Sequence, residues 1–233
     1  MIFTPTLQKA RFLRRYKRFL ADVQMPDGTE ITVHCPNTGS MRECLLEGSD
    51  CWLLHSDNPK RKYAWTWQLA TTPSQDIACI NTHVANSVVG EALANKQITE
   101  LAEFTGFRPE VKYGEGSRID FLLTEGERKC YLEVKSVTLL EDGHGYFPDA
   151  KSTRGQKHLE ELIKVKQAGF DAVLLFCVMH TGINSVAPAS HIDPRYAALL
   201  SEAANTGVKV LAYKTSISAE EITLAESLPV VIE

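Results

Sequence analysis

The chain has 233 residues, of which 44% are hydrophobic and 23% charged, and its formal net charge is −4 at pH 7. This is the composition of an ordinary globular protein, long enough for one large or two modest domains with buried cores. A net negative charge gives no overall attraction to nucleic acid, so any such binding requires a local basic surface.

The cysteines and the hydropathy indicate the cellular compartment of the protein. The six cysteines show no CxxC spacing and most lie in apolar runs, which predicts buried free thiols in a reducing compartment. No apolar run approaches the roughly 18 residues that cross a bilayer, and the basic, aromatic N-terminus has no signal-peptide core. We therefore expect a cytoplasmic protein that does not enter a membrane.

The first notable segment is residues 9–19, KARFLRRYKRF, which is strongly basic within an acidic chain. Cations that neutralise phosphates and aromatic rings that stack on bases together make a sequence-tolerant nucleic-acid surface. A solvated face with an apolar stripe behind it is the alternative, and the pattern does not decide between strand and helix. The basic residues are Lys9, Arg11, Arg14, Arg15, Lys17 and Arg18, and the aromatic residues are Phe12, Tyr16 and Phe19.

The next stretch predicts short strands. Apolar and polar residues alternate at 19–25 and at 31–35, on either side of the turn Pro26-Asp27-Gly28, which is typical of a β-hairpin. About five short strands in the first 80 residues favour a small closed barrel, and an OB-like barrel is the natural candidate. The further strands are predicted at residues 51–55, 63–70 and 77–80.

The loops of this predicted barrel carry a second basic and aromatic cluster. Lys60, Arg61 and Lys62 lie directly before Tyr63, and two tryptophans, at positions 65 and 67, follow. Two such clusters in one acidic chain favour a nucleic-acid groove in this domain.

The pattern changes near residue 82 to one of helices alternating with strands. We therefore predict two domains, an OB-like nucleic-acid-binding domain at residues 1–81 and an α/β domain with a mixed sheet at residues 82–233. The elements predicted in the second domain are a helix within 84–104, a strand at 109–113, a hairpin at 117–137, a helix at 154–167 and a fully buried strand at 171–179.

The hairpin at residues 117–137 organises the candidate site. With its turn at Gly126 and Glu127, counting back along both strands sets Asp120 across from Glu133, with Cβ atoms roughly 4.5–5.5 Å apart. Two carboxylates at that spacing on mostly buried strands require a cation between them. Lys135 lies on the same face as Glu133, since strand side chains alternate.

This set of side chains suits metal-dependent phosphodiester chemistry. Two carboxylates completed by waters are a typical Mg²⁺ site beside a phosphate, where the metal activates water and offsets charge, and Lys135 could orient the water or stabilise the transition state. The arrangement resembles the PD-(D/E)xK nuclease superfamily, with Asp120, Glu133 and Lys135 at its motif positions, although Ile119 stands where that motif has proline. A surface ion pair between Glu133 and Lys135 is the alternative.

Other polar residues could extend the site. Glu91 on the first predicted helix and Glu110 on the strand before the hairpin are candidate additional metal ligands, because the superfamily often takes a ligand from one of these places. Gln156 is a candidate catalytic residue, and the helix start that carries it also favours phosphate through its dipole. The other residues at this helix start are Arg154 and Lys157, both candidate nucleic-acid contacts, and His158.

The C-terminal segment 199–218 allows two interpretations. It fits a helix-turn-helix frame with a turn at Gly207, but the would-be recognition helix contains the β-like run at 208–213. We favour a helix at about 194–205 that ends at Gly207, followed by a strand that joins the sheet.

Several long blocks resemble the sugar fermentation stimulation protein A (SfsA) family over nearly the whole chain. The resemblance implies an OB-like domain followed by a nuclease-like domain, a bacterial protein that binds DNA non-specifically, and a link to regulation of maltose metabolism. The blocks are HCPNTGSM (34–41), SDNPKRKY (56–63), EVKYGEGSRIDF (110–121), YLEVKSVTL (131–139), GYFPDA (145–150) and RGQKHLEEL (154–162).

Two functions from different classes follow. The first is a Mg²⁺- or Mn²⁺-dependent nuclease of low sequence specificity, acting on DNA or RNA through Asp120, Glu133 and Lys135. The second is a non-catalytic DNA-binding regulator of sugar metabolism, in which the nuclease-like fold, or a helix-turn-helix at 199–218, serves for binding alone. Intact acids favour the first, although a structural ion cluster would also keep them.

Overall fold

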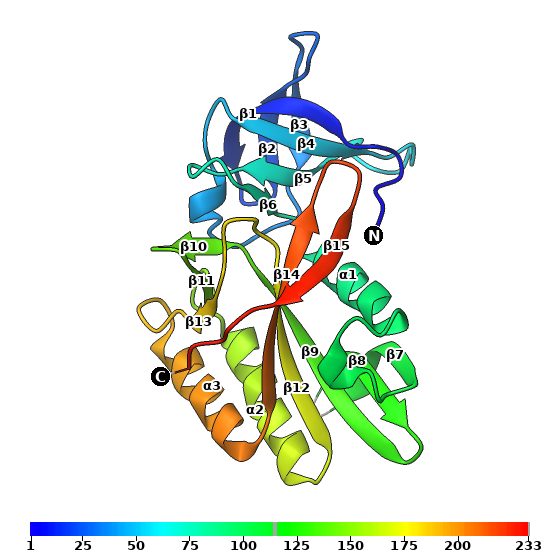
Figure 1. Cartoon of the computed structure of the whole chain (residues 1–233). Helices are drawn as coiled ribbons and strands as arrows, with labels where there is room; N and C mark the ends of the chain where they lie inside the picture. Colours follow the sequence, from blue (N-terminus) through cyan, green and yellow to red (C-terminus); the bar gives the residue numbers. More distant parts are fainter. Residues whose placement is uncertain (114–115, 233) are drawn as a thin grey trace.

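The computed structural model describes residues 1–113 and 116–232. Figure 1 shows an all-β domain, in blue and cyan, above an α/β domain that contains the rest of the described chain. Two residues of the block at 110–121 and the last residue of the predicted second domain lie outside the described part. The predicted boundary at residues 81 and 82 falls between the last strand of the first domain and the first helix of the second.

The first domain is a barrel of five strands that closes on itself. The strands are hydrogen-bonded in the order β3-β2-β1-β4-β5, and the pairing of His34 on β3 with Thr66 on β5 closes the ring. A sixth strand, β6, pairs with β5. The predicted small barrel is therefore confirmed. Its strands are β1 (Gln8–Tyr16), β2 (Leu20–Gln24), β3 (Glu30–His34), β4 (Asp50–His55), β5 (Trp65–Thr71) and β6 (Ile77–Cys79), with a short 3-10 helix, η1 (Arg42–Cys44), before β4.

The basic segment at residues 9–19 forms β1 and the turn that follows. Lys9 and Arg11 are exposed while Ala10 and Phe12 are buried, which is the period of a half-buried strand. Phe12 stacks on the fully buried Trp67, with ring centroids 4.8 Å apart. The prediction that these two aromatic rings belong to a base-stacking surface is therefore wrong, because strand alternation places both in the barrel core.

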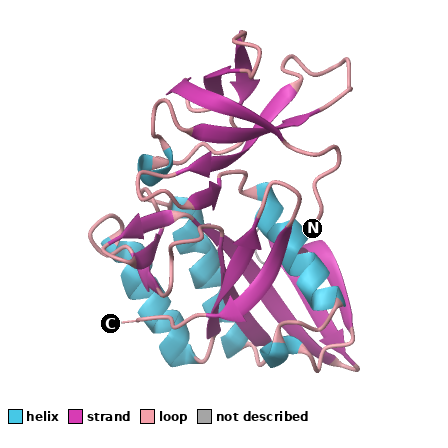
Figure 2. Ribbon diagram, turned by 45° about the horizontal axis from the view of Figure 1, so that its top comes forward, coloured by secondary structure: helices cyan, strands magenta, loops and turns pink. Residues whose placement is uncertain are grey.

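The second domain is built on a six-stranded mixed sheet in the order β15-β14-β12-β9-β8-β7. The middle strands β9, β12 and β14 run parallel, and the outer strands run antiparallel to their neighbours. Helix α1 packs on one face, and α2 and α3 pack on the other (Figure 2). The elements are α1 (His83–Ala94), η2 (Thr99–Leu101), β7 (Gly106–Tyr113), β8 (Ser117–Glu125), β9 (Arg128–Val137), α2 (Thr153–Gln167), β12 (Asp171–Val178), α3 (Pro194–Thr206), β14 (Lys209–Ile217) and β15 (Ile222–Ser227).

The first helix is shorter than predicted. It ends at Ala94, and Lys96 takes the left-handed conformation with φ 54°, which cannot continue a helix. Ile98 and Leu101 nevertheless lie in the same core as the helix. The apolar spacing of residues 84–104 therefore arises because these side chains share one core, and not because they form one continuous helix.

Four strands were not predicted because they are short or lie on an edge. Runs of three or four residues are too brief for a period-two pattern to emerge. Three of these strands form a separate small sheet in the order β10-β11-β13, and the fourth, β15, is the edge of the large sheet. The strands of the small sheet are β10 (Leu139–Glu141), β11 (His144–Phe147) and β13 (Val186–Pro188).

The C-terminal segment is not a helix-turn-helix. Helix α3 ends at Gly207, whose φ of 95° requires glycine-like freedom, and β14 then pairs in parallel with β12 from Lys209 onward. Burial of Ala212 and Tyr213 in the sheet stabilises the strand. The helix-turn-helix alternative is thus wrong, and the predicted helix, glycine cap and strand are confirmed.

A loop of the barrel, residues 36–40, contacts the second domain. The Arg15 guanidinium donates to the carbonyl oxygens of Asn37, Gly39 and Ser40 at 2.8, 3.0 and 3.3 Å. On its other side the loop contacts the second domain, where Ser40 Oγ donates to the Asp149 carbonyl oxygen at 2.9 Å. A Cβ on Gly39 would lie 2.5 Å from a carboxylate oxygen of Asp149, so this contact excludes a larger side chain.

All six cysteines are buried free thiols, as predicted. Among the helices of residues 1–113 and 116–232, none is long and apolar enough to cross a membrane.

The role of Arg15 gives a stability prediction. We expect Arg15→Ala to lower the free energy of unfolding by about 2 kcal/mol, because a charged donor is removed from several part-buried carbonyl groups. Urea unfolding at neutral pH measures the change. Arg14→Ala is the matched control, since Arg14 is mostly exposed and pairs with Asp22 on the surface. An equal loss in both variants would contradict a structural role specific to Arg15.

Candidate metal and nucleic-acid site

The hairpin of β8 and β9 has the predicted register. Its described pairs run from Glu125 and Arg128 at the turn to Phe121 and Leu132, so Asp120 and Glu133 occupy the next position along both strands.

Beside this position, a backbone N–H of β9 is bonded to a side chain of β8 and not to its backbone. The backbone N–H of Val134 donates to Asp120 Oδ2 at 2.8 Å, and Asn86 Nδ2 on α1 donates to Asp120 Oδ1 at 2.7 Å. A side-chain oxygen of Asp120 thus accepts the N–H of a strand residue, which fixes this carboxylate against β9.

Glu133 is buried and hydrogen-bonded to a lysine and a histidine. It is only 2% exposed, and its Oε1 accepts a hydrogen bond from Lys135 Nζ at 2.7 Å and another from His158 Nδ1 on α2. Lys135 Nζ also lies 3.1 Å from His158 Nδ1. The other carboxylate oxygen, Oε2, is buried and has no hydrogen-bond partner among the described residues.

The two carboxylates differ in their affinity for protons. Burial and the negative charge of Glu133 raise the pKa of Asp120 above its ordinary value. Burial alone would also raise the pKa of Glu133, but the hydrogen bond from His158 and the charge of Lys135 outweigh burial and lower it. Glu133 is therefore the carboxylate of the pair that ionises more readily. The repulsion between the two negative charges disfavours ionisation of Asp120.

These residues fit a hard divalent cation. Glu133 Oε2 is an unsatisfied buried oxygen, and a second carboxylate lies beside it in a region of low dielectric. Within the described part of the chain, no group of three or more His, Cys, Asp or Glu side chains is placed to hold a metal. The remaining ligands would thus come from water and substrate, as is usual for Mg²⁺ at phosphate sites.

The structure does not bring three of the predicted residues into this cluster. Glu91 pairs with the N-terminal ammonium of Met1. Glu110 is exposed on β7 with φ 54°. Gln156 Nε2 donates to both carboxylate oxygens of Asp193, at 2.8 and 3.0 Å. Their roles as ligands or catalyst stay predictions that this geometry does not support.

Two contacts of the site were missed from the sequence. Asn86 was not singled out, and no motif in its helix indicates that its amide reaches Asp120. His158 was noted only as part of the helix start, whereas the structure places it against Glu133. Both contacts depend on how α1 and α2 pack on the sheet.

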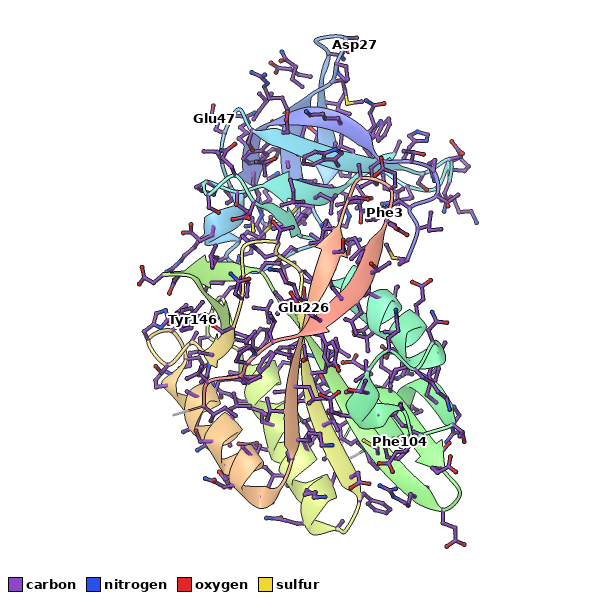
Figure 3. The ribbon with its side chains drawn as sticks, viewed as in Figure 1. Phe3, Asp27, Glu47, Phe104, Tyr146 and Glu226 are labelled. Carbon is purple, nitrogen blue, oxygen red and sulfur yellow. The ribbon has the colours of Figure 1, made fainter. Side chains whose placement is uncertain are left out.

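A groove of about 350 Å³ lies beside the cluster, between the barrel loop and the start of α2. Arg154 lines it, and Arg154 Nε lies 3.4 Å from His158 Nε2, so the groove leads toward Glu133. Tyr146, labelled in Figure 3, lines the groove from β11. The other lining residues include Asn37, Thr38, Gly39, Ser136, Thr138, Asp149 and Ser152.

The predicted nucleic-acid residues fall into two groups. Several are engaged within the protein: Lys9 pairs with Asp50 at 2.7 Å, Arg14 with Asp22 at 2.8 Å, and Arg61 donates to Thr66 at 2.6 Å, in addition to Arg15 on the loop carbonyls. Arg15 on β1 therefore has a structural role, because it holds the loop at residues 36–40. The second group is exposed to solvent and comprises Arg11, Lys17, Arg18, Lys60 and Lys62 on the barrel, together with Arg154 and Lys157 on α2, of which Arg154 also contacts His158 and Lys157 pairs with Glu161.

The protein belongs to the class that combines a closed OB-type barrel with a mixed-sheet α/β domain, and a groove lies between a barrel loop and the second domain. Two family models match it, "SfsA N-terminal OB domain" over residues 13–80 and "Sugar fermentation stimulation protein RE domain" over residues 83–221. The chain belongs to the sugar fermentation stimulation protein (SfsA) family.

Individual relatives agree with this family. The chain is 59% identical to a sugar fermentation stimulation protein homolog of Shewanella sp. (strain ANA-3) over 99% of both chains. It is 53% identical to a homolog of Marinomonas sp. (strain MWYL1), over 99% of this chain and 90% of the relative. Among solved structures, Pyrococcus furiosus SfsA in complex with Ca²⁺ matches with a TM-score of 0.88 and 28% identity, over 100% of this chain and 98% of that one.

The charge on Asp120 gives a pH-dependent prediction for metal-free protein. Because its pKa is raised in the folded state, the folded protein binds the proton more tightly than the unfolded chain, and ionisation costs stability as pH rises above 3.8. We expect Asp120→Asn to gain stability relative to wild type as pH rises from that value to neutrality. Urea unfolding in EDTA at several pH values measures this, with the exposed Asp142→Asn as control. A difference that does not change with pH would contradict the charge penalty.

Proposed function

We propose that this protein is a metal-dependent phosphodiesterase that cleaves nucleic acid with low sequence specificity. The observation that carries the proposal is the buried Glu133 carboxylate, with one oxygen unpartnered, beside an Asp120 whose pKa is raised by the Glu133 charge. The Ca²⁺ in the structure of the Pyrococcus furiosus relative supports a divalent cation, and Mg²⁺ or Mn²⁺ are the cations suited to the chemistry.

Asp120 and Glu133 would hold the metal, which supplies the charge that attracts the phosphate and activates water. Lys135 Nζ, 2.7 Å from Glu133 Oε1, would orient the attacking water or offset charge in the transition state. His158 keeps Glu133 ionised and fixes its orientation by hydrogen bonding to the same oxygen.

The groove beside the cluster provides a place for the substrate backbone. Arg154 lies in its wall at the first turn of α2, where the helix dipole adds partial positive charge. The exposed cations of the β1–β2 turn, Lys17 and Arg18, follow the strand that carries Arg15, which holds the groove loop. A polyanion bound in the groove would therefore meet positive charge from both domains.

One observation favours binding without catalysis. In this structure Glu133 Oε1 already pairs with Lys135 and accepts a hydrogen bond from His158, so the cluster has internal partners that need no metal. A regulator that only binds DNA could keep such a cluster for stability.

Cleavage assays distinguish these functions. We expect purified protein with Mg²⁺ or Mn²⁺ to cleave single-stranded, duplex or branched DNA or RNA, and Asp120→Ala or Lys135→Ala to reduce the rate on the order of 100-fold, as expected for loss of one electrostatic group. Lys96→Asn, which removes an exposed charge on a left-handed turn residue far from the cluster in sequence, is the control.

Metal binding is measured separately from cleavage. Mn²⁺ at 100 times its dissociation constant stabilises a protein by about 2.7 kcal/mol, and this stabilisation should vanish in Asp120→Ala. Cleavage that persists in both active-site variants would falsify the site. Absence of cleavage on every substrate would favour the binding function.

The exposed basic residues of the barrel give a salt-dependence prediction. Replacing a residue that contacts phosphate should reduce the slope of log affinity against log salt by roughly 0.7–0.9. We expect this for Arg11→Ala and for Arg18→Asn, the latter chosen because asparagine tolerates the left-handed φ of 62° at that position. Lys96→Asn is the control, matched in charge, exposure and backbone conformation. Unchanged slopes in both variants would show that β1 and its turn form only a solvated face.

A further inference from the structure

A second cavity, of about 640 Å³, lies along α2 on the same face of the sheet as Glu133. Its volume is in the range of small-molecule and nucleotide sites. No part of the proposed chemistry uses it. The lining residues the argument uses are Lys112, Tyr113, Tyr131, Glu161, Lys164 and Phe170.

One side of the cavity is aromatic. The Tyr131 ring lies between those of Tyr113 and Phe170, with centroids 5.8 Å from each. Phe170 is 38% exposed, and Lys112 and Lys164 are exposed around the opening. Aromatic rings together with cations are complementary to a base and its phosphates.

The inner wall of the cavity carries two buried polar side chains, Glu161 and Tyr113. Glu161 is 5% exposed; its Oε1 accepts a hydrogen bond from Ser117 Oγ at 2.9 Å, while Oε2 is buried with no partner among the described residues. Burial, the charges of Glu133 and Glu161 and the contact of its hydroxyl with Glu161 raise the pKa of Tyr113, which therefore stays a protonated donor. The polar edge of a nucleobase carries both donors and acceptors, and it would bind here by exchanging with this contact between Tyr113 and Glu161.

The cavity adjoins the candidate metal site. Tyr131 and Glu133 are two residues apart on β9 and so lie on one face of it, and His158 and Glu161 are one helical turn apart on α2. The effect of the Glu133 charge on Tyr113 also shows that the two places are close. A nucleotide in the cavity would thus be next to a phosphate at the candidate metal site.

We propose that this cavity binds an unstacked nucleobase adjacent to a phosphate attracted by the metal that Asp120 and Glu133 would hold, so that the substrate is single-stranded or locally unpaired nucleic acid. The inference rests on the proposed function and names its substrate class. A base stacked within a duplex cannot enter such a cavity without leaving the helix, which costs a few kcal/mol that an unpaired strand does not lose.

Binding in EDTA tests this without requiring catalysis. The probes are a short fluorescein-labelled DNA strand of mixed sequence and its matching duplex, followed by fluorescence anisotropy. We expect wild type to prefer the single strand, and Phe170→Ala to weaken single-strand binding about 10-fold, as expected for loss of one stacking contact, with duplex binding unchanged. Phe107→Ala is the matched control, because Phe107 is 37% exposed and contacts Phe121, which lies in the core on the opposite face of the sheet.

A second variant, Lys164→Ala, should weaken both probes through charge and needs no buried side chain to change. Equal affinity of wild type for strand and duplex, or unchanged single-strand binding by Phe170→Ala, would overturn the inference even if Asp120→Ala abolishes metal-dependent cleavage. Loss of single-strand binding in Phe170→Ala supports the base-binding cavity even if no nucleic acid is cleaved, in which case the proposed function fails separately.

Discussion

The burial of the Glu133 carboxylate is the constraint on which the site depends. An isolated carboxylate in the interior is very costly unless it is paired and hydrogen-bonded. Strand β9 supplies Lys135, helix α2 supplies His158, and the remaining oxygen is left unsatisfied. Sheet, helix and hairpin therefore meet at one carboxylate, and its unsatisfied oxygen distinguishes this cluster from an ion cluster in which every oxygen has a partner.

The two domains contribute different parts of one surface. The second domain supplies the carboxylates, while the barrel supplies the loop that lines the groove beside them. With a net charge of −4, the whole molecule does not attract polyanions. The proposed nucleic-acid binding would instead depend on exposed residues such as Arg18 and Arg154, close to the groove or to the strand that holds its loop.

Local patterns in the sequence predicted much of the fold and the proximity of Asp120, Glu133 and Lys135. The turn at Gly126 fixed the hairpin register, and that register placed Asp120 and Glu133 together. Properties that depend on tertiary packing could not be predicted in the same way. The sequence pattern of Phe12 and Trp67 is compatible with a base-stacking surface, but closure of the barrel buries both rings. Asn86 reaches Asp120 only because α1 packs on the sheet.

The loop at residues 36–40 is hydrogen-bonded on two sides, to Arg15 of the barrel and to Asp149 of the second domain. Neither half of the chain alone forms both walls of the groove. Small changes in this loop would alter which molecules fit without touching the carboxylates. The shape of the groove and the carboxylate cluster can therefore change independently, since they are encoded in different stretches of the chain.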